Sequence, residues 1–479
     1  MAIITSKDFI ERINKLKPNV YENGTSIQRT DERFNSAINV VKLSFDSAFH
    51  NEHKKLVVTK SNFNNKDVIN RFNNLHKSSE DLLKKQEMIR VLAPLAGGCI
   101  QRCMSNDVLN ALAITTKEID EKKGTDYHSR FLKYMEYYQK NDLVAAGAQT
   151  DTKGDRSKRP HEQVDPDLYL HMVGKRKGGI IVSGAKIHNT IGSYADEILV
   201  IPTRALTSEE GEWAVAFAIP ADTEGIKFIS RVTTPRPRYE LKCPYADVAG
   251  WNDSFTIFDN VFVPEDRIFM CGEWEFGARL ALLFANFHRH SYTGCKPGVT
   301  DVVMGACALA AEYNGVSKAP HITNEITELM VIAELIYATG IASAVKSRCT
   351  SSGIYEPAFV YSNAGRYLAG KNIYHEYETL CAISGGLPAT LPHEGDWLNA
   401  ETKGYLEKYI MRNPKISAES QHRLWRFISD LTCSAVGGVM QYAGVHGGGS
   451  PIMELIGIRG SYDLESRKQL VKYLAGIKD

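Results

Sequence analysis

The chain has 479 residues, which is too long for one compact hydrophobic core and predicts two or three structural units. Its 57 Lys and Arg residues balance 56 Asp and Glu residues, which gives a formal net charge of +1. That balance argues against nucleic acid or a membrane surface as the main partner.

The sequence predicts neither a signal peptide nor a membrane span. The N-terminus lacks a charged start followed by a long apolar stretch, and no uninterrupted apolar run approaches the ~20 residues of a membrane helix. The nine cysteines are odd in number and scattered, unlike a disulfide framework. We therefore expect a soluble protein in a reducing cytoplasm.

Residues 1–143 are predicted to form a helical N-terminal domain. The stretch 66–92 is long and amphipathic, with apolar residues at helical spacings. Pro94 and the following glycines interrupt it, and the helical pattern resumes over 99–119. A further aromatic-rich helix is expected at 127–140.

Residues 144–275 are predicted to form a middle β domain. Here the pattern changes to short β-like runs, each bounded by Gly, Pro, Asp or Asn. The segment 175–179 between two of these runs is typical of a hairpin turn. The runs lie at 168–173, 179–183, 197–202, 213–219, 227–232 and 255–263.

Residues 276–479 return to helical periodicity and predict a C-terminal helical bundle with short loops. The whole chain is thus expected to be an α+β protein in the order helices, β domain, helices. It carries no GxGxxG fingerprint and no P-loop, which disfavours a Rossmann or P-loop nucleotide site. The apolar runs of this last part lie at 277–288, 299–314, 322–347, 355–370 and 418–437.

Three thiols and a histidine form a candidate ligand set for an iron–sulfur cluster or a metal ion. Cys99 and Cys103 lie four residues apart, which in a helix places both thiols on one face. Cys295 follows two histidines, His288 and His290, and each of these is either a ligand or a core residue. A lone cysteine pair in a helix is more often structural, so the set matters only as a whole.

Other polar groups near these ligands are candidates for proton transfer. Tyr292 and Lys296 flank Cys295 and suit that role if desolvation lowers the pKa of the lysine. The alternative is a core tyrosine and a surface lysine. The loop at 153–156 has basic side chains that suit an anionic cofactor, although a solvated charged loop explains the same composition.

These stretches together resemble the 4-hydroxybutyryl-CoA dehydratases (vinylacetyl-CoA Δ-isomerases), within the wider 4-hydroxyphenylacetate 3-hydroxylase family. The similarity covers nearly the whole chain. The segments that carry it are Lys60-Ser61-Asn62, Asn74-Leu75-His76, Gln101-Arg102-Cys103, Asp151 to Arg156, Asp165-Pro166-Asp167-Leu168, Phe258-Asp259-Asn260-Val261-Phe262, His288-Arg289, Gly294-Cys295-Lys296 and His446 to Pro451.

The resemblance implies an acyl-CoA dehydrogenase-like fold with a β-barrel middle domain, assembled as a homotetramer. It implies a [4Fe–4S] cluster with Cys99, Cys103, His288 and Cys295 as ligands. It also implies FAD, held by the middle domain. The residues that match the family's flavin-binding segments are Gln149, Thr150, Asp151, Lys153, Gly154, Asp155, Arg156, His188, Asn189 and Thr190.

The activity that the resemblance implies is radical dehydration or double-bond isomerisation of a CoA thioester. In the family, flavin accepts an electron from the deprotonated substrate, and cluster iron acts as a Lewis acid for the leaving hydroxyl. Residues matching His288, Tyr292 and Lys296 lie near this chemistry.

Two positions depart from the dehydratase pattern. Asp253 and Ala443 stand where the dehydratases carry glutamates. An Asp is one methylene shorter than a Glu, and an Ala side chain can neither accept a proton nor bind a hydroxyl. We therefore expect retained cofactors, an altered part of the substrate chemistry, and Asp253 as a further candidate catalytic residue.

Two other functions fit parts of the same pattern. A flavin-dependent aromatic monooxygenase of the same fold would act on a phenol, but it has no use for three cysteine ligands. A non-catalytic metal or redox protein would hold zinc through the thiols and would not retain a flavin. The fold alone does not decide between these functions.

Overall fold

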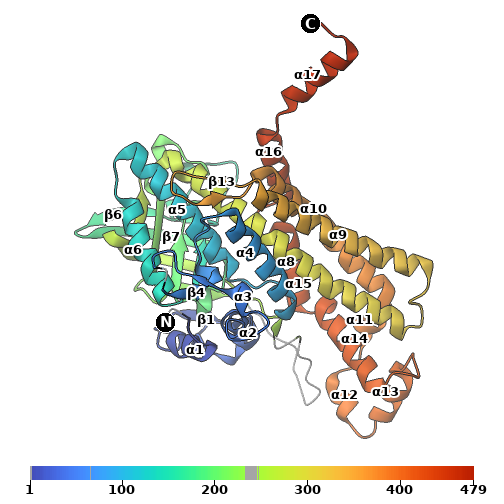
Figure 1. Ribbon diagram of the computed structural model, residues 1–479. Helices are drawn as coiled ribbons and strands as arrows, with labels where there is room; N and C mark the ends of the chain where they lie inside the picture. The colour runs from blue at the N-terminus through green and yellow to red at the C-terminus, as the bar shows by residue number, and fades with distance from the viewer. Residues whose placement is uncertain (1–2, 65, 232–244, 246–247, 479) are drawn as a thin grey trace.

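The protein is described here from a computed structural model, in which residues 3–64, 66–231, 245 and 248–478 are placed. The order of helical, β and helical segments predicted from the sequence is confirmed (Figure 1). Cys243 and residue 232, the last residue of a predicted β run, lie outside the described residues.

The predicted helix at 127–140 is confirmed, but the one at 66–92 is wrong in its first part. Residues 68–73 form a short strand and a 3-10 turn, because the Asn70 side chain accepts a hydrogen bond from the Phe72 N–H at 3.1 Å. Ser78 then caps a new helix through the Asp81 N–H. The helices of this region are α1 (Ser6–Ile13), α2 (Asn35–Asp46), α3 (Lys54–Val57), α4 (Ser79–Leu95), α5 (Cys103–Lys123) and α6 (Tyr127–Lys140).

Cys99 does not lie in a helix, so the expected shared helix face with Cys103 is wrong. Helix α5 begins only at Cys103, and Cys99 belongs to the connection from α4. Gln101 in this connection has a φ of 62°, a left-handed conformation that a helix cannot contain. A tight irregular loop, instead of helical spacing, therefore places the Cys99 thiol.

The middle of the chain forms two sheets. Their strand orders are β2-β1-β10-β11-β7-β6 and β12-β9-β8-β5, and the described residues do not show the closed barrel that was expected. Arg176 pairs with Gly179 between β6 and β7, which confirms the hairpin. The strands are β1 (Val20–Glu22), β2 (Thr25–Ile27), β5 (Ala145–Ala148), β6 (His171–Arg176), β7 (Gly179–Thr190), β8 (Glu197–Val200), β9 (Val215–Pro220), β10 (Ile226–Ser230), β11 (Asp253–Pro264) and β12 (Ile268–Cys271).

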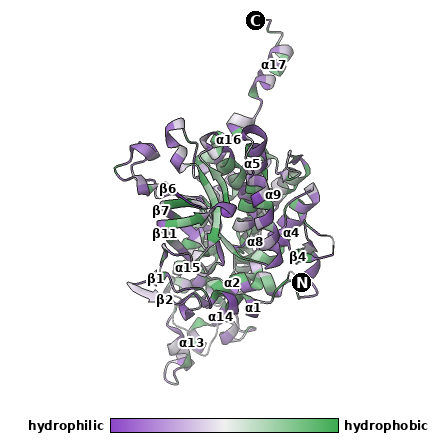
Figure 2. Ribbon diagram, turned by 90° about the vertical axis from the view of Figure 1, so that its left-hand side faces the viewer, coloured by the Kyte–Doolittle hydropathy of each residue, from purple (hydrophilic) through white to green (hydrophobic). Residues whose placement is uncertain are grey.

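Strands β1 and β2 come from the N-terminal region and extend the larger sheet. Strand β3 (Val58–Lys60) pairs with the next strand in the chain, β4 (Val68–Asn70), in a separate two-stranded sheet. The N-terminal part is therefore not purely helical. The domain boundaries 1–143, 144–275 and 276–479 stay a prediction. In Figure 2 the apolar colouring is concentrated in β7, β11 and the central helices.

The C-terminal part is a helical bundle, in which two predicted apolar runs form one long helix. Helix α8 (Gly277–Tyr313) continues through Pro297, which has no N–H to donate to the Thr293 carbonyl one turn earlier. The Gln86 amide of α4 donates to that carbonyl at 3.4 Å and so replaces part of the lost bond. Gly294 permits this approach, because a Cβ there would lie 2.7 Å from the Gln86 carbonyl oxygen.

The long helices α9 and α10 pack against α8, and α17 stands clear of the body (Figure 1). Among the residues that the structure places, α9 alone is long and apolar enough to cross a membrane by length and composition, which is weak evidence. The remaining helices are α9 (Pro320–Val345), α10 (Phe359–Ser384), α11 (Leu387–Thr390), α12 (Glu394–Leu398), α13 (Lys403–Ile410), α14 (Ala418–Cys433), α15 (Ala435–His446), α16 (Pro451–Ser461) and α17 (Leu464–Ala475).

Candidate functional site

The three cysteines predicted as ligands meet where α4, α5 and α8 pack together. Cys103 and Cys295 are buried in an apolar cluster that includes Met88 and Ile89 of α4. The Cys103 and Cys295 thiols donate hydrogen bonds to the Cys99 sulfur, and these bonds lower the pKa of Cys99 well below its ordinary value. The same bonds, together with burial, raise the pKa of the other two thiols. Residues far apart in the sequence thus form one thiol group in which one member favours the thiolate that metals bind.

His288 joins this group, whereas His290 does not. The ligand atoms of Cys103, Asp107 and His288 all lie within 4.8 Å of one another. The His290 ring is fully buried. Burial lowers the pKa of His290 to about 3, so it is a neutral core residue. The donor set near the thiols is therefore three sulfurs and the His288 imidazole, which fits an iron–sulfur cluster.

Tyr292 lies one turn before Cys295 on α8, and its hydroxyl reaches the last turn of α15 (Ala435–His446). It donates to the carbonyl oxygens of Ala443 and Gly444, each at 3.3 Å. The Arg366 guanidinium lies over the tyrosine ring at 4.4 Å from the centroid. Burial raises the pKa of Tyr292, so the phenol keeps its proton.

Lys296 is not the surface lysine of the alternative interpretation, because only 2% of it is exposed. Its ammonium pairs with the Glu376 carboxylate of α10 and donates to the Thr300 hydroxyl at 2.9 Å. Thr300 in turn donates to the same carboxylate oxygen at 3.0 Å. The lysine is thus buried and ion-paired next to Cys295, and its role in proton transfer stays a prediction.

The two segments predicted to bind flavin lie side by side. The Ile187 N–H donates to the Thr150 carbonyl at 2.8 Å, and the Lys186 ammonium pairs with Asp151 at 2.8 Å. The loop from Gln149 to Arg156 therefore runs along the end of β7, where His188, Asn189 and Thr190 lie.

Backbone strain collects in these segments. Lys153 and His188 have φ values of 73° and 58°, which are uncommon outside glycine and often mark ligand-binding sites. Gly154, Asp155, Arg156 and His188 are exposed, whereas Asp151, Asn189 and Thr190 are buried.

Asp253 holds the end of the second predicted flavin segment. Its two carboxylate oxygens accept hydrogen bonds from the Thr190 hydroxyl at 2.6 Å and the Trp251 indole at 2.9 Å. Tyr194 donates to the Gln101 side chain at 3.2 Å, and the Gln101 N–H donates to the Cys99 sulfur at 3.4 Å. The cysteine loop is therefore linked to the turn that follows Thr190.

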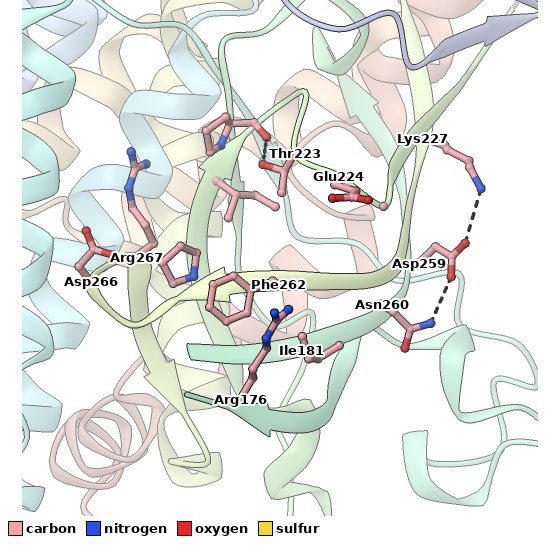
Figure 3. A pocket seen from close by; sticks show the side chains of 14 residues that line it. Arg176, Ile181, Thr223, Glu224, Lys227, Asp259, Asn260, Phe262, Asp266 and Arg267 are labelled. Atoms are coloured by element: carbon pink, nitrogen blue, oxygen red, sulfur yellow. Dashed lines mark hydrogen bonds and ion pairs between the residues drawn. The ribbon is translucent and has the colours of Figure 1, made fainter. Parts of the chain in front are cut away.

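A separate hollow lies elsewhere, on the β sheets (Figure 3). It measures about 910 Å³, and the predicted site residues do not line it. The cations Arg176, Lys227 and Arg267 in its wall are matched by three carboxylates, so the hollow has no excess charge for a cofactor phosphate. We therefore keep the candidate site at the thiols.

Four buried charged residues of the site were missed by sequence reasoning: Lys85, Asp107, Arg366 and Glu376. Asp107 had a usable signal, because it follows Cys103 by four residues and so lies on the same helix face. The other three carry no local pattern, since their partners come from distant helices.

The loop geometry predicts that Gly154→Ala weakens flavin retention about 10-fold or more. Gly154 has a φ of 50°, and a Cβ there would lie 2.4 Å from the Gln163 side-chain oxygen and 2.7 Å from Leu168 Cδ1. The Gln163 oxygen also accepts the Asp155 N–H at 3.0 Å, so the added methyl shifts the whole loop. Flavin bound per chain after gel filtration measures the effect, and Gly178→Ala on the open hairpin is the control. Equal retention in both variants would contradict the assignment of this loop.

The fold and the buried thiol site belong to an enzyme family that the comparisons with known proteins identify. Family models described as 4-hydroxyphenylacetate 3-hydroxylase N terminal and C terminal match residues 5–270 and 278–476, and the chain belongs to this family. It is 37% identical to the 4-hydroxybutyryl-CoA dehydratase/vinylacetyl-CoA-Δ-isomerase of Clostridium aminobutyricum, over 99% of this chain and 100% of that protein. The predicted resemblance is thereby confirmed.

Solved structures agree with the sequence comparison. An oxygen-tolerant archaeal 4-hydroxybutyryl-CoA dehydratase from N. maritimus matches with a TM-score of 0.96 and 36% identity, over 100% of this chain and 96% of that chain. The oxygenase component of 4-hydroxyphenylacetate 3-monooxygenase complexed with FAD shares the fold, with a TM-score of 0.89 and 22% identity over 98% of each chain.

Proposed function

We propose that the chain is an FAD- and [4Fe–4S]-dependent dehydratase and isomerase of a hydroxyacyl-CoA related to 4-hydroxybutyryl-CoA. The observation that carries this proposal is the convergence of Cys99, Cys103, Cys295 and His288 at one buried place. The full-length similarity to a dehydratase supports the same reaction class. When bound, the cluster would supply Lewis-acidic iron and FAD would supply one-electron chemistry.

Residues of the chain itself would hold protons and exclude water around these groups. Lys296 presents a buried ammonium that Glu376 keeps in place, and Tyr292 presents a protonated phenol. Both belong to α8, one turn apart, on the helix that carries Cys295. The two groups are suited to donate a proton to a leaving hydroxyl, or to a substrate carbon atom during double-bond isomerisation.

Two arginines fix the glycine-rich segment 447–449, which follows α15. Arg366 donates to the Gly447 carbonyl at 2.5 Å, and Arg289 donates to the Gly448 carbonyl at 2.9 Å. In this way the segment after α15 is braced against α8 and α10. A braced segment excludes water and presents backbone groups at a constant distance, which favours the orientation of a bound thioester.

The replaced glutamates point to a changed substrate within the same class. Both carboxylate oxygens of Asp253 accept hydrogen bonds, one from Thr190 and one from Trp251. At position 443 only the backbone carbonyl contacts Tyr292. We infer a hydroxyacyl-CoA whose leaving group does not need a carboxylate at position 443. A homotetramer and a location in the cytoplasm remain expectations of the family resemblance.

The test is the absorption spectrum of protein purified without oxygen, with iron, sulfide and flavin quantified per chain. We expect about four irons and about one FAD. The same protein is then incubated with 4-hydroxybutyryl-CoA and with vinylacetyl-CoA, and the products are followed by mass spectrometry. Flavin without iron, with hydroxylation of a phenol by reduced FAD and O2, would favour the monooxygenase. Zinc without flavin would favour a non-catalytic metal protein.

A further inference from the structure

One buried carboxylate connects three helices beside the thiol group. Asp107 lies on α5 one turn after Cys103 and is fully buried. Its Oδ2 lies 3.0 Å from the His288 Nδ1 of α8. Its Oδ1 accepts hydrogen bonds from the Ser291 hydroxyl at 2.8 Å and from the Lys85 ammonium of α4 at 3.0 Å.

The charges in this network are balanced inside the protein. Lys85 and Asp107 form an ion pair whose two side chains are both 0% exposed. A buried carboxylate is tolerated only when charge and hydrogen bonds replace the lost water, and this one has an ammonium, a hydroxyl and an imidazole. A purely structural ion pair would not need the imidazole, because Lys85 alone compensates the charge.

The contact to His288 leaves one imidazole nitrogen for other partners. A metal-bound histidine usually donates its second ring N–H to a carboxylate or carbonyl, which fixes both the tautomer and the ring orientation. Here Nδ1 faces Asp107, so Nε2 is the nitrogen available on the side of the ring opposite to the carboxylate. The Phe284 ring stacks on the imidazole at 5.6 Å between centroids and further restricts it.

We infer that Asp107 is a positioning residue that orients His288 through Nδ1, so that Nε2 serves as the cluster ligand, and that Lys85 and Ser291 hold Asp107 for this task. The inference rests on the proposed function, because it concerns the same cluster. Helix α5 would thus contribute a ligand, Cys103, and the orienting group for a second ligand one turn later.

A different arrangement of the same residues is a single metal ion bound directly by Cys103, Asp107 and His288, whose ligand atoms lie within 4.8 Å of one another. The hydrogen bonds disfavour it. Both oxygens of Asp107 already have partners, and the Lys85 ammonium already compensates the carboxylate charge that would attract a metal ion. That arrangement also leaves Cys99 and Cys295 without a role.

The experiment compares iron retention in wild-type protein and in Asp107→Asn, both purified without oxygen. We expect Asp107→Asn to lose iron to the chelator bathophenanthroline about 10-fold faster or more, the range known for orienting partners of metal ligands. Pulsed EPR of the reduced protein should show a weaker or altered nitrogen coupling from the histidine ligand. Flavin content should stay equal, and Ser291→Ala should cause a smaller change in the same direction.

The matched control is Glu197→Gln, which removes another buried carboxylate, paired with Arg267 at 2.8 Å in the β region. It should leave iron release and the EPR signal unchanged. If Asp107→Asn does not fold because Lys85 is left unpaired, the double variant Lys85→Met/Asp107→Asn removes both charges, and the same accelerated iron loss is expected.

Three results would overturn the inference. Iron release and nitrogen coupling in an Asp107 variant that equal those of the wild type would show that His288 needs no orienting group. A single iron or zinc per chain, without sulfide and abolished by Asp107→Asn, would make Asp107 a ligand. Wild-type protein without iron would refute the proposed function itself, which the first result leaves intact.

Discussion

Cys103→Ala protein, purified without oxygen, is expected to contain less than a tenth of the wild-type iron and to keep its flavin. The Cys103 thiol is buried and hydrogen-bonds to the Cys99 sulfur, so its removal leaves three of the four proposed ligands. An iron–sulfur cluster is held by four protein ligands, so a cluster that lacks one thiolate ligand is less stable and is lost. Iron and sulfide per chain and the visible absorption measure the effect.

Cys307→Ala is the matched control for this variant. Cys307 is also a buried thiol, on the same helix α8 as Cys295, but it packs in the separate apolar core of the C-terminal bundle with Leu380 and Ile373. Its loss should leave the iron content at the wild-type level. Unchanged iron in Cys103→Ala would refute the cluster assignment, whereas iron loss in both variants would indicate a general loss of packing.

Glu376→Leu is expected to destabilise the protein by about 3–5 kcal/mol, because it leaves the Lys296 ammonium buried without its anion. The double variant Lys296→Met/Glu376→Leu removes both charges and should recover most of that stability. The shift of the urea unfolding midpoint, at one fixed protein concentration, measures both effects. The double variant should be stable but should not turn over a hydroxyacyl-CoA. Such a result separates the role of Lys296 in the reaction from its role in folding.

The control for this cycle is an exposed ion pair. Arg90 and Glu334 are hydrogen-bonded, but the Glu334 side chain is 64% exposed, so Glu334→Ala should cost no more than about 1 kcal/mol. A change of that small size in Glu376→Leu would contradict the view that Lys296 is charged in the folded protein. Full turnover in the double variant would contradict its proposed part in proton transfer.

Local pattern was sufficient wherever the structure depends on neighbours in the sequence. The helix at 127–140 and the hairpin around Gly178 follow from periodicity and turn residues, and both are confirmed. The family was predicted correctly from the resemblance, because many short motifs of the family occur in order along the chain. Local pattern failed at 66–73 and at Cys99, where short polar side chains and a left-handed residue interrupt helices that the apolar spacing predicts.

Whether the middle sheets close into a barrel could not be predicted from the sequence either. Whether strands close into a barrel depends on pairing between distant segments, and here β1 and β2 from the N-terminal region join the larger sheet. Each of the six predicted runs overlaps a strand, because alternation and turn residues mark individual strands, but β5 and β12 were not predicted.

The sequence by itself determined the order of the segments, because that order depends on residue type and spacing. The resemblance of its motifs indicated the family and the four candidate ligands of a cluster. Only the tertiary structure decided which charged residues pair with one another and with His288 near the candidate ligands. Lys85 meets Asp107 across 22 residues, Asp107 meets His288 across 181, and Lys296 meets Glu376 across 80. A charged residue in a helix is usually solvated, and its burial becomes favourable only when packing brings an opposite charge from another helix within hydrogen-bond distance.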